Sequence, residues 1–203
     1  DWDDNDVTVP GFVVYGASGS AAKTYAADNK LTFITLPGWN KQGNGWYYYQ
    51  EDKTVLKNAW KKDSKGWCYL GKDGKMVTNG WAKDSKGWCY VGSDGHMVTN
   101  DWAKDSHGWC WMGADGYWVS NKWIQSGGQW YYIKSNHYMA ANEWAKDAGG
   151  WMYMDANGKI TKNKWIKSGG YWYYLKSNGY MATGTLKISG KTYKFDSAGR
   201  WIS

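Results

Sequence analysis

Aromatic and apolar residues alternate with polar ones over short segments of this chain, and turn-forming residues separate the segments. Residues 60–69 show the pattern, because two short alternating segments flank Asp, Ser and Gly residues at 63–66. Alternate side chains of a strand point to opposite faces, and these residue types favour tight turns. The segment is therefore predicted to be a β-hairpin. Its predicted cross-strand pairs are Lys62 with Trp67, Lys61 with Cys68 and Trp60 with Tyr69.

This register divides the hairpin into two faces. Trp60, Trp67 and Tyr69 share one face, whereas Cys68 and Leu70 share the other. A lone two-stranded hairpin is only marginally stable in water. Stacked hairpins bury each other's faces, so the predicted fold is all-β, a repeat β-solenoid of stacked β-hairpins.

The same pattern recurs every 21 residues, without insertion, in seven full repeats that begin at Trp39 and are numbered 1 to 7 here. The first tryptophan series is Trp39, Trp60, Trp81, Trp102, Trp123, Trp144 and Trp165. The second tryptophan series is Trp46, Trp67, Trp88, Trp109, Trp130, Trp151 and Trp172. A third aromatic series is Tyr48, Tyr69, Tyr90, Trp111, Tyr132, Tyr153 and Tyr174.

Each repeat also carries a mostly apolar residue after a second turn, called the wall residue below. This series is Val55, Met76, Met97, Trp118, Met139, Ile160 and Met181. An eighth, degenerate copy follows, and a fixed period of 21 puts Leu186, Tyr193 and Phe195 at the places of the three aromatic series. Terminal repeats of solenoids commonly act as caps, so repeat 8 is predicted to be a cap that completes no Trp-rich site, with Trp201 covering the final hairpin.

The composition and charge narrow the class of partner. The chain has 203 residues with 18 Trp and 17 Tyr but only 3 Phe. Rings with a polar N–H or O–H suit half-exposed binding surfaces better than a dry core. The net charge is +7, and it is concentrated after residue 36. A basic, aromatic-rich body favours an anionic polymer, and nucleic acid and teichoic acid both fit at this point.

The unit GWAKDSKGWCYVGSDGHMVTN, residues 80–100, resembles the cell-wall-binding repeat of choline-binding proteins, whose form is Gly-Trp, a short turn, Trp-Tyr-Tyr and Gly-x-Met. The resemblance covers residues 37–203. It implies hairpins stacked into a left-handed superhelix, with aromatic cages between adjacent hairpins that hold the choline of teichoic acids. Similar repeats occur in glucan-binding proteins and in clostridial toxin tails, so the resemblance specifies the fold more tightly than the ligand.

On this resemblance the cage residues are the three aromatic series together with Met76, Met97, Met139 and Met181. Up to six inter-repeat sites of unequal quality are expected. Val55, Trp118 and Ile160 depart from the methionine of the pattern, and Trp111 replaces a tyrosine. Lys53 and His137 replace the glycine two residues before the wall residue, so those two turns are predicted to be distorted.

The cysteines and histidines give no metal site by spacing. Cys68, Cys89 and Cys110 occupy one place in successive repeats, whereas zinc motifs space their ligands two to four residues apart. Rotation between successive hairpins should point the thiols apart, so free thiols that fill space beside the hairpin are expected. The three histidines, His96, His107 and His137, are interpreted as solvated turn residues that no Cys or carboxylate joins in a credible triad.

Residues 1–36 do not repeat. Residues 12–15 and 31–36 are predicted to be strands, and residues 21–27 a helix with Ser20 as its N-cap. The stretch 14–36 resembles the closing segment of bacterial leucine-rich-repeat surface proteins of the BspA type. Residues 1–36 are therefore interpreted as the end of an upstream domain, with 1–6 a frayed linker. Pro37 marks the boundary with the repeats, 37–203.

Together these observations predict a secreted, non-catalytic module that attaches a protein to the bacterial cell surface. Its expected partner is choline-bearing teichoic or lipoteichoic acid, and no cofactor, metal or membrane span is expected. The alternatives are a glucan-binding array, whose rings would stack on sugar faces, and an adhesin for a host protein. Wall hydrolases often carry such repeats, so a catalytic domain upstream stays open. Nucleic acid is the least favoured partner, because the basic groups lie in turns rather than in one stripe.

Overall fold

The computed structural model describes residues 11–203. The predicted linker at residues 1–6 lies outside this range. The first described elements are strand β1 (Val13–Gly16), helix α1 (Ala21–Asp28) and strand β2 (Thr32–Thr35). The two strands pair in parallel, Val13 with Thr32 and Gly16 with Thr35. The predicted strand–helix–strand order is confirmed. Within residues 11–203, no helix is long and apolar enough to cross a bilayer.

Ser20 precedes the helix in an extended conformation, as an N-cap does, but its hydroxyl makes no capping hydrogen bond. That hydroxyl is buried without a partner. The N-cap expectation is therefore right about the backbone position and wrong about the bond. The missing bond removes a contribution that typically reaches about 1 kcal/mol.

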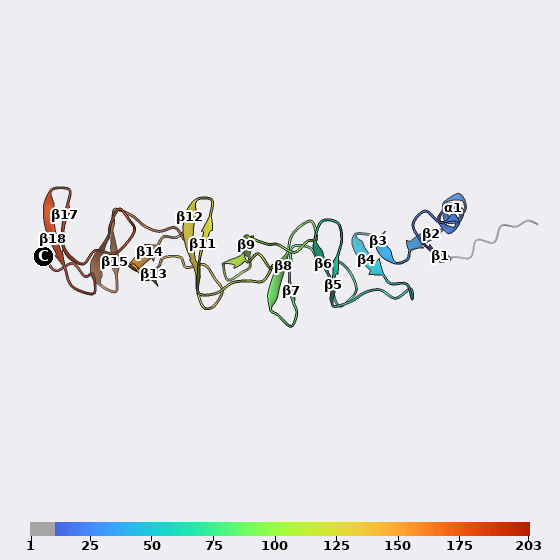
Figure 1. The fold of residues 1–203 in the computed structure, drawn as a ribbon, viewed down its shortest axis with the longest axis horizontal. Helices are drawn as coiled ribbons and strands as arrows, with labels where there is room; N and C mark the ends of the chain where they lie inside the picture. The colour runs from blue at the N-terminus through green and yellow to red at the C-terminus, as the bar shows by residue number, and fades with distance from the viewer. Residues whose placement is uncertain (1–10) are drawn as a thin grey trace, which may run out of the picture. The chain divides into compact units, whose positions relative to one another are not determined.

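Eight antiparallel hairpins follow, each a separate two-stranded sheet (Figure 1). They are β3 (Gly38–Gln42) with β4 (Gly45–Tyr49), β5 (Ala59–Lys62) with β6 (Trp67–Leu70), β7 (Gly80–Lys83) with β8 (Trp88–Val91), β9 (Asp101–Lys104) with β10 (Trp109–Met112), β11 (Lys122–Ser126) with β12 (Gln129–Ile133), β13 (Glu143–Asp147) with β14 (Gly150–Met154), β15 (Lys164–Ser168) with β16 (Tyr171–Leu175), and β17 (Gly184–Ile188) with β18 (Lys191–Phe195). The predicted cross-strand pairs of repeat 2 are all present. The all-β fold of repeated hairpins is thus confirmed.

The chain divides into two compact units, one ending at Met97 and one spanning Val98–Ser203. The first unit holds the strand–helix–strand segment and hairpins β3–β4, β5–β6 and β7–β8. The second unit holds the other five hairpins. The assignment of residues 1–36 and 37–203 as separate domains stays a prediction.

The core of each unit consists of aliphatic and methionine side chains rather than of tryptophans. In repeats 2 to 7 the residue directly after the third aromatic series is fully buried. This series is Leu70, Val91, Met112, Ile133, Met154 and Leu175, all at 0% exposure. Burying one such side chain contributes about 1.5–3 kcal/mol. The second tryptophan series, in contrast, lies at the surface except for the half-buried Trp88, and the other six rings have exposed fractions from 42% at Trp46 to 48% at Trp130. Rings that are not needed for the core are available to a ligand.

The second turn of each repeat brings consecutive repeats into contact. Its glycine has a positive φ, for example 73° at Gly158, and a Cβ at that position would collide with the thioether of Met139, the wall residue of the preceding repeat. Lys53 and His137 adopt the same conformation, with φ of 66° and 69°. The predicted distortion of those two turns is therefore wrong. His137 instead stacks flat on the preceding wall residue, Trp118, with ring centroids 4.1 Å apart.

The last hairpin has a shorter spacing than the fixed period assumed. Gly184 pairs with Phe195 as Lys164 pairs with Leu175, so repeat 8 follows repeat 7 at 20 residues rather than 21. The deleted residue lies between the wall residue and the hairpin, where Gly184 takes the left-handed conformation with φ of 70°. Phe195 is thus the core residue of repeat 8, Tyr193 follows the position of the second tryptophan, and Trp201 is the wall residue.

Candidate functional site

Repeats 4 and 5 enclose a small aromatic cavity of about 170 Å³. Its walls are Trp102 and Trp109 from one hairpin, and Tyr131 and Met139 from the next repeat, with Asn157 of repeat 6 at its edge. Trp102 and Tyr131 meet edge to face with centroids 5.0 Å apart. The Met139 N–H donates to the Trp109 carbonyl oxygen at 2.8 Å. This bond fixes the backbones of repeats 4 and 5 relative to each other at the point where the four side chains converge.

Tyr131 comes from the face of the hairpin that sequence reasoning left out of the site. It pairs with Ile124, so it points away from the face that carries Trp130 and Tyr132. Each hairpin therefore presents its tryptophan face to the next repeat and its other face to the preceding one. The missed signal was visible in the chain, because the place of Tyr131 is occupied by Tyr in repeats 1, 5 and 7 but by Cys in repeats 2, 3 and 4.

A second cage of the same composition lies between repeats 6 and 7. Trp144 meets Tyr173 with centroids 5.0 Å apart. The N–H of the wall residue Met181 donates to the carbonyl oxygen of Trp151 at 2.8 Å. The arrangement repeats that of Trp102, Tyr131, Met139 and Trp109, so the two interfaces offer equivalent sites.

Repeat 8 was predicted to complete no Trp-rich site, but it places two rings at its interface with repeat 7 and so makes a third candidate cage. Trp165 of repeat 7 lies 5.1 Å from Tyr193 and 5.9 Å from Trp201, measured between ring centroids. The Trp201 N–H donates to the Trp172 carbonyl oxygen at 2.8 Å, the bond that Met181 makes with Trp151. Trp201 therefore stands in the methionine place of this cage and does not simply cover the final hairpin.

Other interfaces within the two units lack the third ring. Cys68 faces repeat 1 and Cys89 faces repeat 2 at the place of Tyr131, and both are fully buried. Met152 takes that place between repeats 5 and 6, where Trp123 and Ile160 pack onto a core of Ala140, Ala145 and Met154. The wall residues Met76 and Met97 still bond to the preceding tryptophan carbonyl oxygens, both at 2.7 Å. These interfaces keep the backbone of a cage without its full set of rings.

The rings of the third aromatic series support the tryptophans of the cages from behind and do not line the cages. Each of its rings packs against the first tryptophan of its own hairpin, with centroids 5.0–5.5 Å apart. Neither Trp111 nor Tyr132 lines the cavity between repeats 4 and 5. Of the residues proposed from sequence, Trp102, Trp109 and Met139 line this cavity, and the tyrosine that lines it comes from the neighbouring position.

Hydrogen bonds to the next repeat orient the first tryptophan series. The indole N–H groups of Trp102 and Trp144 donate to the hydroxyls of Ser126 and Ser168, each at 3.1 Å. The indole N–H of Trp60 donates to Asp84 at 3.0 Å. These side chains lie at the ends of the following hairpins. Each bond therefore fixes a ring plane before any ligand arrives.

A lysine stands beside several rings of the second tryptophan series. It is the cross-strand neighbour of the tryptophan, as Lys104 is of Trp109, and its Nζ lies 5.3 Å from that ring centroid. The same contact joins Lys146 to Trp151 at 5.7 Å and Lys167 to Trp172 at 5.9 Å. All three cages therefore carry a cation at the rim.

Aspartates in the hairpin turns link each of two repeats to the next. The Tyr138 hydroxyl donates to Asp105 and the Tyr180 hydroxyl to Asp147, both at 2.9 Å. Burial alone would raise the pKa of Asp105, but hydrogen bonds from the N–H groups of His107 and Gly108 and from Tyr138 lower it overall. Burial and the bond to Asp105 together raise the pKa of Tyr138 to about 12.

The structure corrects the view of the histidines and supports that of the cysteines. Cys68, Cys89 and Cys110 are buried thiols that form no disulfide, as expected. His107 is exposed, but His137 stacks on Trp118 and bonds to the Val119 carbonyl oxygen. His96 contacts both Asp63 and Asp94. Among residues 11–203, only Asp63, Cys68 and His96 bring three ligand atoms of the kinds that bind metals within 4.8 Å of one another.

Comparison with protein families matches the repeats themselves. Residues 162–199 match a model described as choline-binding repeat. Residues 58–76, 79–97, 121–136 and 142–160 match one described as putative cell wall binding repeat. A comparison with curated proteins found no match.

Solved structures of Streptococcus pneumoniae proteins are similar to the chain. Choline binding protein F is 30% identical over 82% of this chain, with a TM-score of 0.54. CbpJ is 28% identical over 78%, with a TM-score of 0.56. The chain spans only 57% and 56% of these two proteins. The choline-binding domain of CbpL is 32% identical with a TM-score of 0.43, and the chain covers 98% of it. With its repeats matched in sequence and its hairpins in structure, the chain belongs to the family of choline-binding repeats, which are cell-wall-binding modules.

Proposed function

We propose that the second unit binds choline at three cages, between repeats 4 and 5, 6 and 7, and 7 and 8. The observation that carries this proposal is the cavity formed by Trp102, Trp109, Tyr131 and Met139. It combines three rings with one thioether, and its bonded backbones hold it open. The solved relatives whose names include choline binding support the choice of ligand.

The chemistry of the cage suits a quaternary ammonium ion. Such an ion has no N–H to donate, so it is held by attraction to ring faces and by apolar contact with its methyl groups. Each ring contact contributes about 0.5–2 kcal/mol. The Met139 thioether is polarizable and adapts to the methyl groups. Cages without the third ring lose one of these contacts, and repeats 2, 3 and 4, which carry Cys in that place, are therefore not assigned sites.

The surroundings of the cage favour an anionic carrier of choline, such as teichoic or lipoteichoic acid. Lys104 lies beside Trp109, where it would attract a phosphate attached to the bound choline. A hollow of about 420 Å³ shares Trp109 and Met139 with the cage and includes Lys134 and Asn136. A polymer that fills several cages at once gains avidity of about 10²–10⁴ over one site. The proposed role is non-catalytic attachment to a cell surface that displays such a polymer.

The proposal is tested by comparing two exposed tryptophans of the same series. Trp109 is 43% exposed and lines a complete cage, whereas Trp130 is 48% exposed and faces the interface with Met152. Trp109→Ala should lower the choline stoichiometry from three to two, and Trp130→Ala should leave it at three. Equilibrium dialysis gives the stoichiometry, and the melting temperature without ligand gives the effect of each change on folding.

Choline should also raise the melting temperature, because a ligand that binds only the folded state stabilises it by RT ln(1 + [L]/Kd) per site. Sodium chloride at equal concentration should not. If neither melting nor tryptophan fluorescence responds to choline, the choline proposal is wrong. A response to an α-glucan in that case would point to rings that stack on sugars.

Phosphocholine should bind more tightly than choline at low salt, and Lys104→Ala should reduce that difference.

A further inference from the structure

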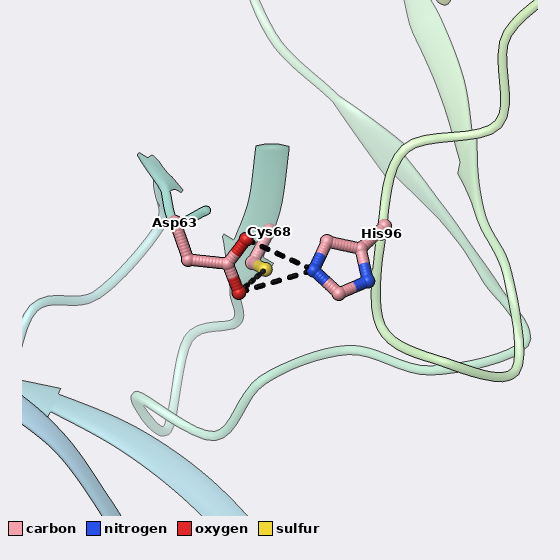
Figure 2. Close-up of side chains that lie close together, drawn as sticks. All are labelled: Asp63, Cys68 and His96. Carbon is pink, nitrogen blue, oxygen red and sulfur yellow. Dashed lines mark hydrogen bonds and ion pairs between the residues drawn. The ribbon is translucent and has the colours of Figure 1, made fainter. Parts of the chain in front are cut away.

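Three side chains with metal-binding atoms converge behind the interface of repeats 2 and 3, outside the cages assigned to choline. Figure 2 shows the Asp63 carboxylate, the Cys68 sulfur and the His96 ring pointing toward one another, with the carboxylate linked to each of the other two. Both carboxylate oxygens lie 3.1 Å from His96 Nε2. The Cys68 thiol points at Asp63 Oδ2, with Sγ 3.7 Å away. Asp63 and Cys68 come from one hairpin and His96 from the turn of the next repeat.

The separations match those of ligands around one ion. Zinc binds sulfur at about 2.3 Å and nitrogen or carboxylate oxygen at about 2.0–2.2 Å. In a tetrahedron with those bond lengths, neighbouring ligand atoms lie about 3.3–3.8 Å apart. The observed 3.1 and 3.7 Å bracket most of this range. An ion therefore needs only small side-chain movements to reach all three donors.

Asp94 completes the surroundings of the histidine. Its Oδ2 lies 3.1 Å from His96 Nδ1, the ring nitrogen that points away from Asp63, close enough for an ion pair but without the angles of a hydrogen bond. Metal-binding histidines commonly donate their second ring N–H to a carboxylate, which fixes the tautomer and leaves the other nitrogen free to bind the ion. His96 is largely buried, with 14% of its side chain exposed, whereas Asp63 is 28% exposed. The ion would thus enter from the side of Asp63.

A second copy of the arrangement, with one ligand exchanged, exists in the same chain. Asp105 and Cys110 of repeat 4 occupy the places of Asp63 and Cys68, and Tyr138 occupies the place of His96. Tyr138 makes the link to its aspartate with a hydroxyl. A hydrogen bond to the turn aspartate of the preceding repeat can therefore form without an imidazole. The imidazole adds a nitrogen that binds Zn²⁺-type ions far better than a neutral phenol oxygen does, so its presence at residue 96 alone calls for a separate explanation.

We propose that Asp63, Cys68 and His96 form a site for Zn²⁺ or a similar borderline-soft divalent ion that joins repeats 2 and 3. Sulfur, imidazole and carboxylate together are the donor set that zinc accepts. Binding breaks the Cys68 S–H bond and the His96 Nε2–H bond that faces Asp63, and it forms a metal–sulfur and a metal–nitrogen bond. The thiol proton goes to solvent, and the ring proton goes to solvent from the imidazolium form or to Nδ1 from the neutral form. A water molecule would supply the fourth ligand.

The protonation of the free site gives the binding a direction with pH. Burial, followed by the charge of Asp63, raises the pKa of Cys68 to about 12. Burial alone would raise the pKa of Asp63, but hydrogen bonds, chiefly from the Lys65 N–H and His96, lower it to about 2. The carboxylate is therefore ready to bind, and the thiol must lose its proton. Burial alone would lower the pKa of His96, but its contacts with the carboxylates of Asp63 and Asp94 raise it, so the ring must also give up a proton and metal affinity should rise with pH.

The test is a titration of the reduced, full-length chain with Co²⁺ alone. A thiolate bound to Co²⁺ gives a charge-transfer band in the near ultraviolet, and Zn²⁺ should abolish the band by displacement. The expected result is one equivalent of Co²⁺ with the band present. Absence of the band in the folded chain would overturn the proposal.

Variants assign the ligands. His96→Tyr copies the Asp105–Tyr138 link, so it should keep the fold and lose the band, as should Cys68→Ser. Cys110→Ser is the matched control and should keep it. Asp94→Asn should weaken binding by about 10–100-fold. Tyr138→His should create a second equivalent at Asp105 and Cys110. A band that survives in folded His96→Tyr or Cys68→Ser, or a folded Tyr138→His chain without a second equivalent, would contradict the assignment.

Discussion

The interfaces between repeats 2 and 3 and between repeats 4 and 5 share the backbone of a cage, but only the interface between repeats 4 and 5 has the third ring. Both have two tryptophans of one hairpin and a methionine of the next. In both, the methionine N–H bonds to the tryptophan carbonyl oxygen, at 2.7 Å for Met97 and 2.8 Å for Met139. One interface has the buried Cys89 where the other has Tyr131. The comparison teaches that the scaffold does not depend on the third ring, so one position per repeat sets ligand capacity independently of the fold.

The largest expected effect comes from making the second unit like the first. Tyr131→Cys together with Tyr173→Cys should lower the choline stoichiometry from three to one, because two cages lose a ring. At ten times Kd, each occupied site contributes about 1.4 kcal/mol to the free energy of unfolding, so about 3 kcal/mol of choline-dependent stabilisation should disappear. Urea unfolding with and without choline measures it. Tyr132→Phe is the control, and an equal loss there would contradict the assignment of Tyr131.

The next effect concerns the contact that supports the wall residue. Gly158→Ala should lower the free energy of unfolding by about 2–4 kcal/mol, because alanine disfavours the positive φ and its Cβ meets Met139. Gly169→Ala is a matched control, since Gly169 also has a positive φ but an alanine Cβ there would meet no atom within 4 Å. It should cost only about 1–2 kcal/mol. Equal losses would mean that the methionine contact is unimportant.

The third prediction extends the comparison to a cage with tryptophan in the methionine place. Trp201→Ala should remove the site between repeats 7 and 8, lowering the stoichiometry from three to two and choline-dependent stabilisation by about 1.4 kcal/mol at ten times Kd. Trp201 is 44% exposed, so stability without choline should change less. A full count of three choline molecules in Trp201→Ala would restore the view of repeat 8 as a cap only.

The smallest expected effect is on the pH dependence of the free energy of unfolding. It isolates the contribution of the hydrogen bond between Tyr138 and Asp105. The pKa of Tyr138 is raised in the folded chain, so its contribution to stability is complete below its ordinary pKa of about 10 and is lost as pH rises toward about 12. The pKa of Asp105 is lowered, so its contribution is lost as pH falls below about 4. Cys110 and His107 are the neighbouring titratable groups.

Tyr138→Phe should flatten part of the alkaline fall in stability while leaving the link of Tyr180 to Asp147 in place. Unfolding followed at a series of pH values from 8 to about 12 checks this. An unchanged alkaline profile in Tyr138→Phe would show that the Tyr138 link does not contribute to it.

The hairpins could be predicted from the sequence because their register depends on local rules. Alternation and the turn at residues 63–66 fixed the pairing of Trp60 with Tyr69, which the structure confirms. The same rules say which side chains share a face but not which neighbouring repeat covers that face. Tyr132 was therefore chosen for the cage and Tyr131 was missed. The variation of Tyr, Cys and Met at the place of Tyr131 was the available signal.

The register of repeat 8 was missed for a different reason. Counting at a fixed period put Leu186 in the place of a tryptophan, whereas the chain had lost one residue before Gly184. The turn glycines carry the correct spacing, because Gly199 follows Gly179 by 20 residues and both have a positive φ, 79° and 88°. The cluster of Asp63, Cys68 and His96 could not be predicted because Asp63 and His96 are 33 residues apart, so only contact between repeats brings them together.

The glycine that seats each methionine has a consequence for how such an array changes over generations. Met139 belongs to repeat 5 and rests on Gly158 of repeat 6, while the rings it closes begin in repeat 4. One cage is thus written across three consecutive copies of the repeat. A duplication or deletion of one whole copy would therefore change the residues that line more than one cage. The boundaries of a repeat therefore do not coincide with the boundaries of a cage. A duplication of one repeat would bring together residues that were not neighbours before and would so create cages of new composition.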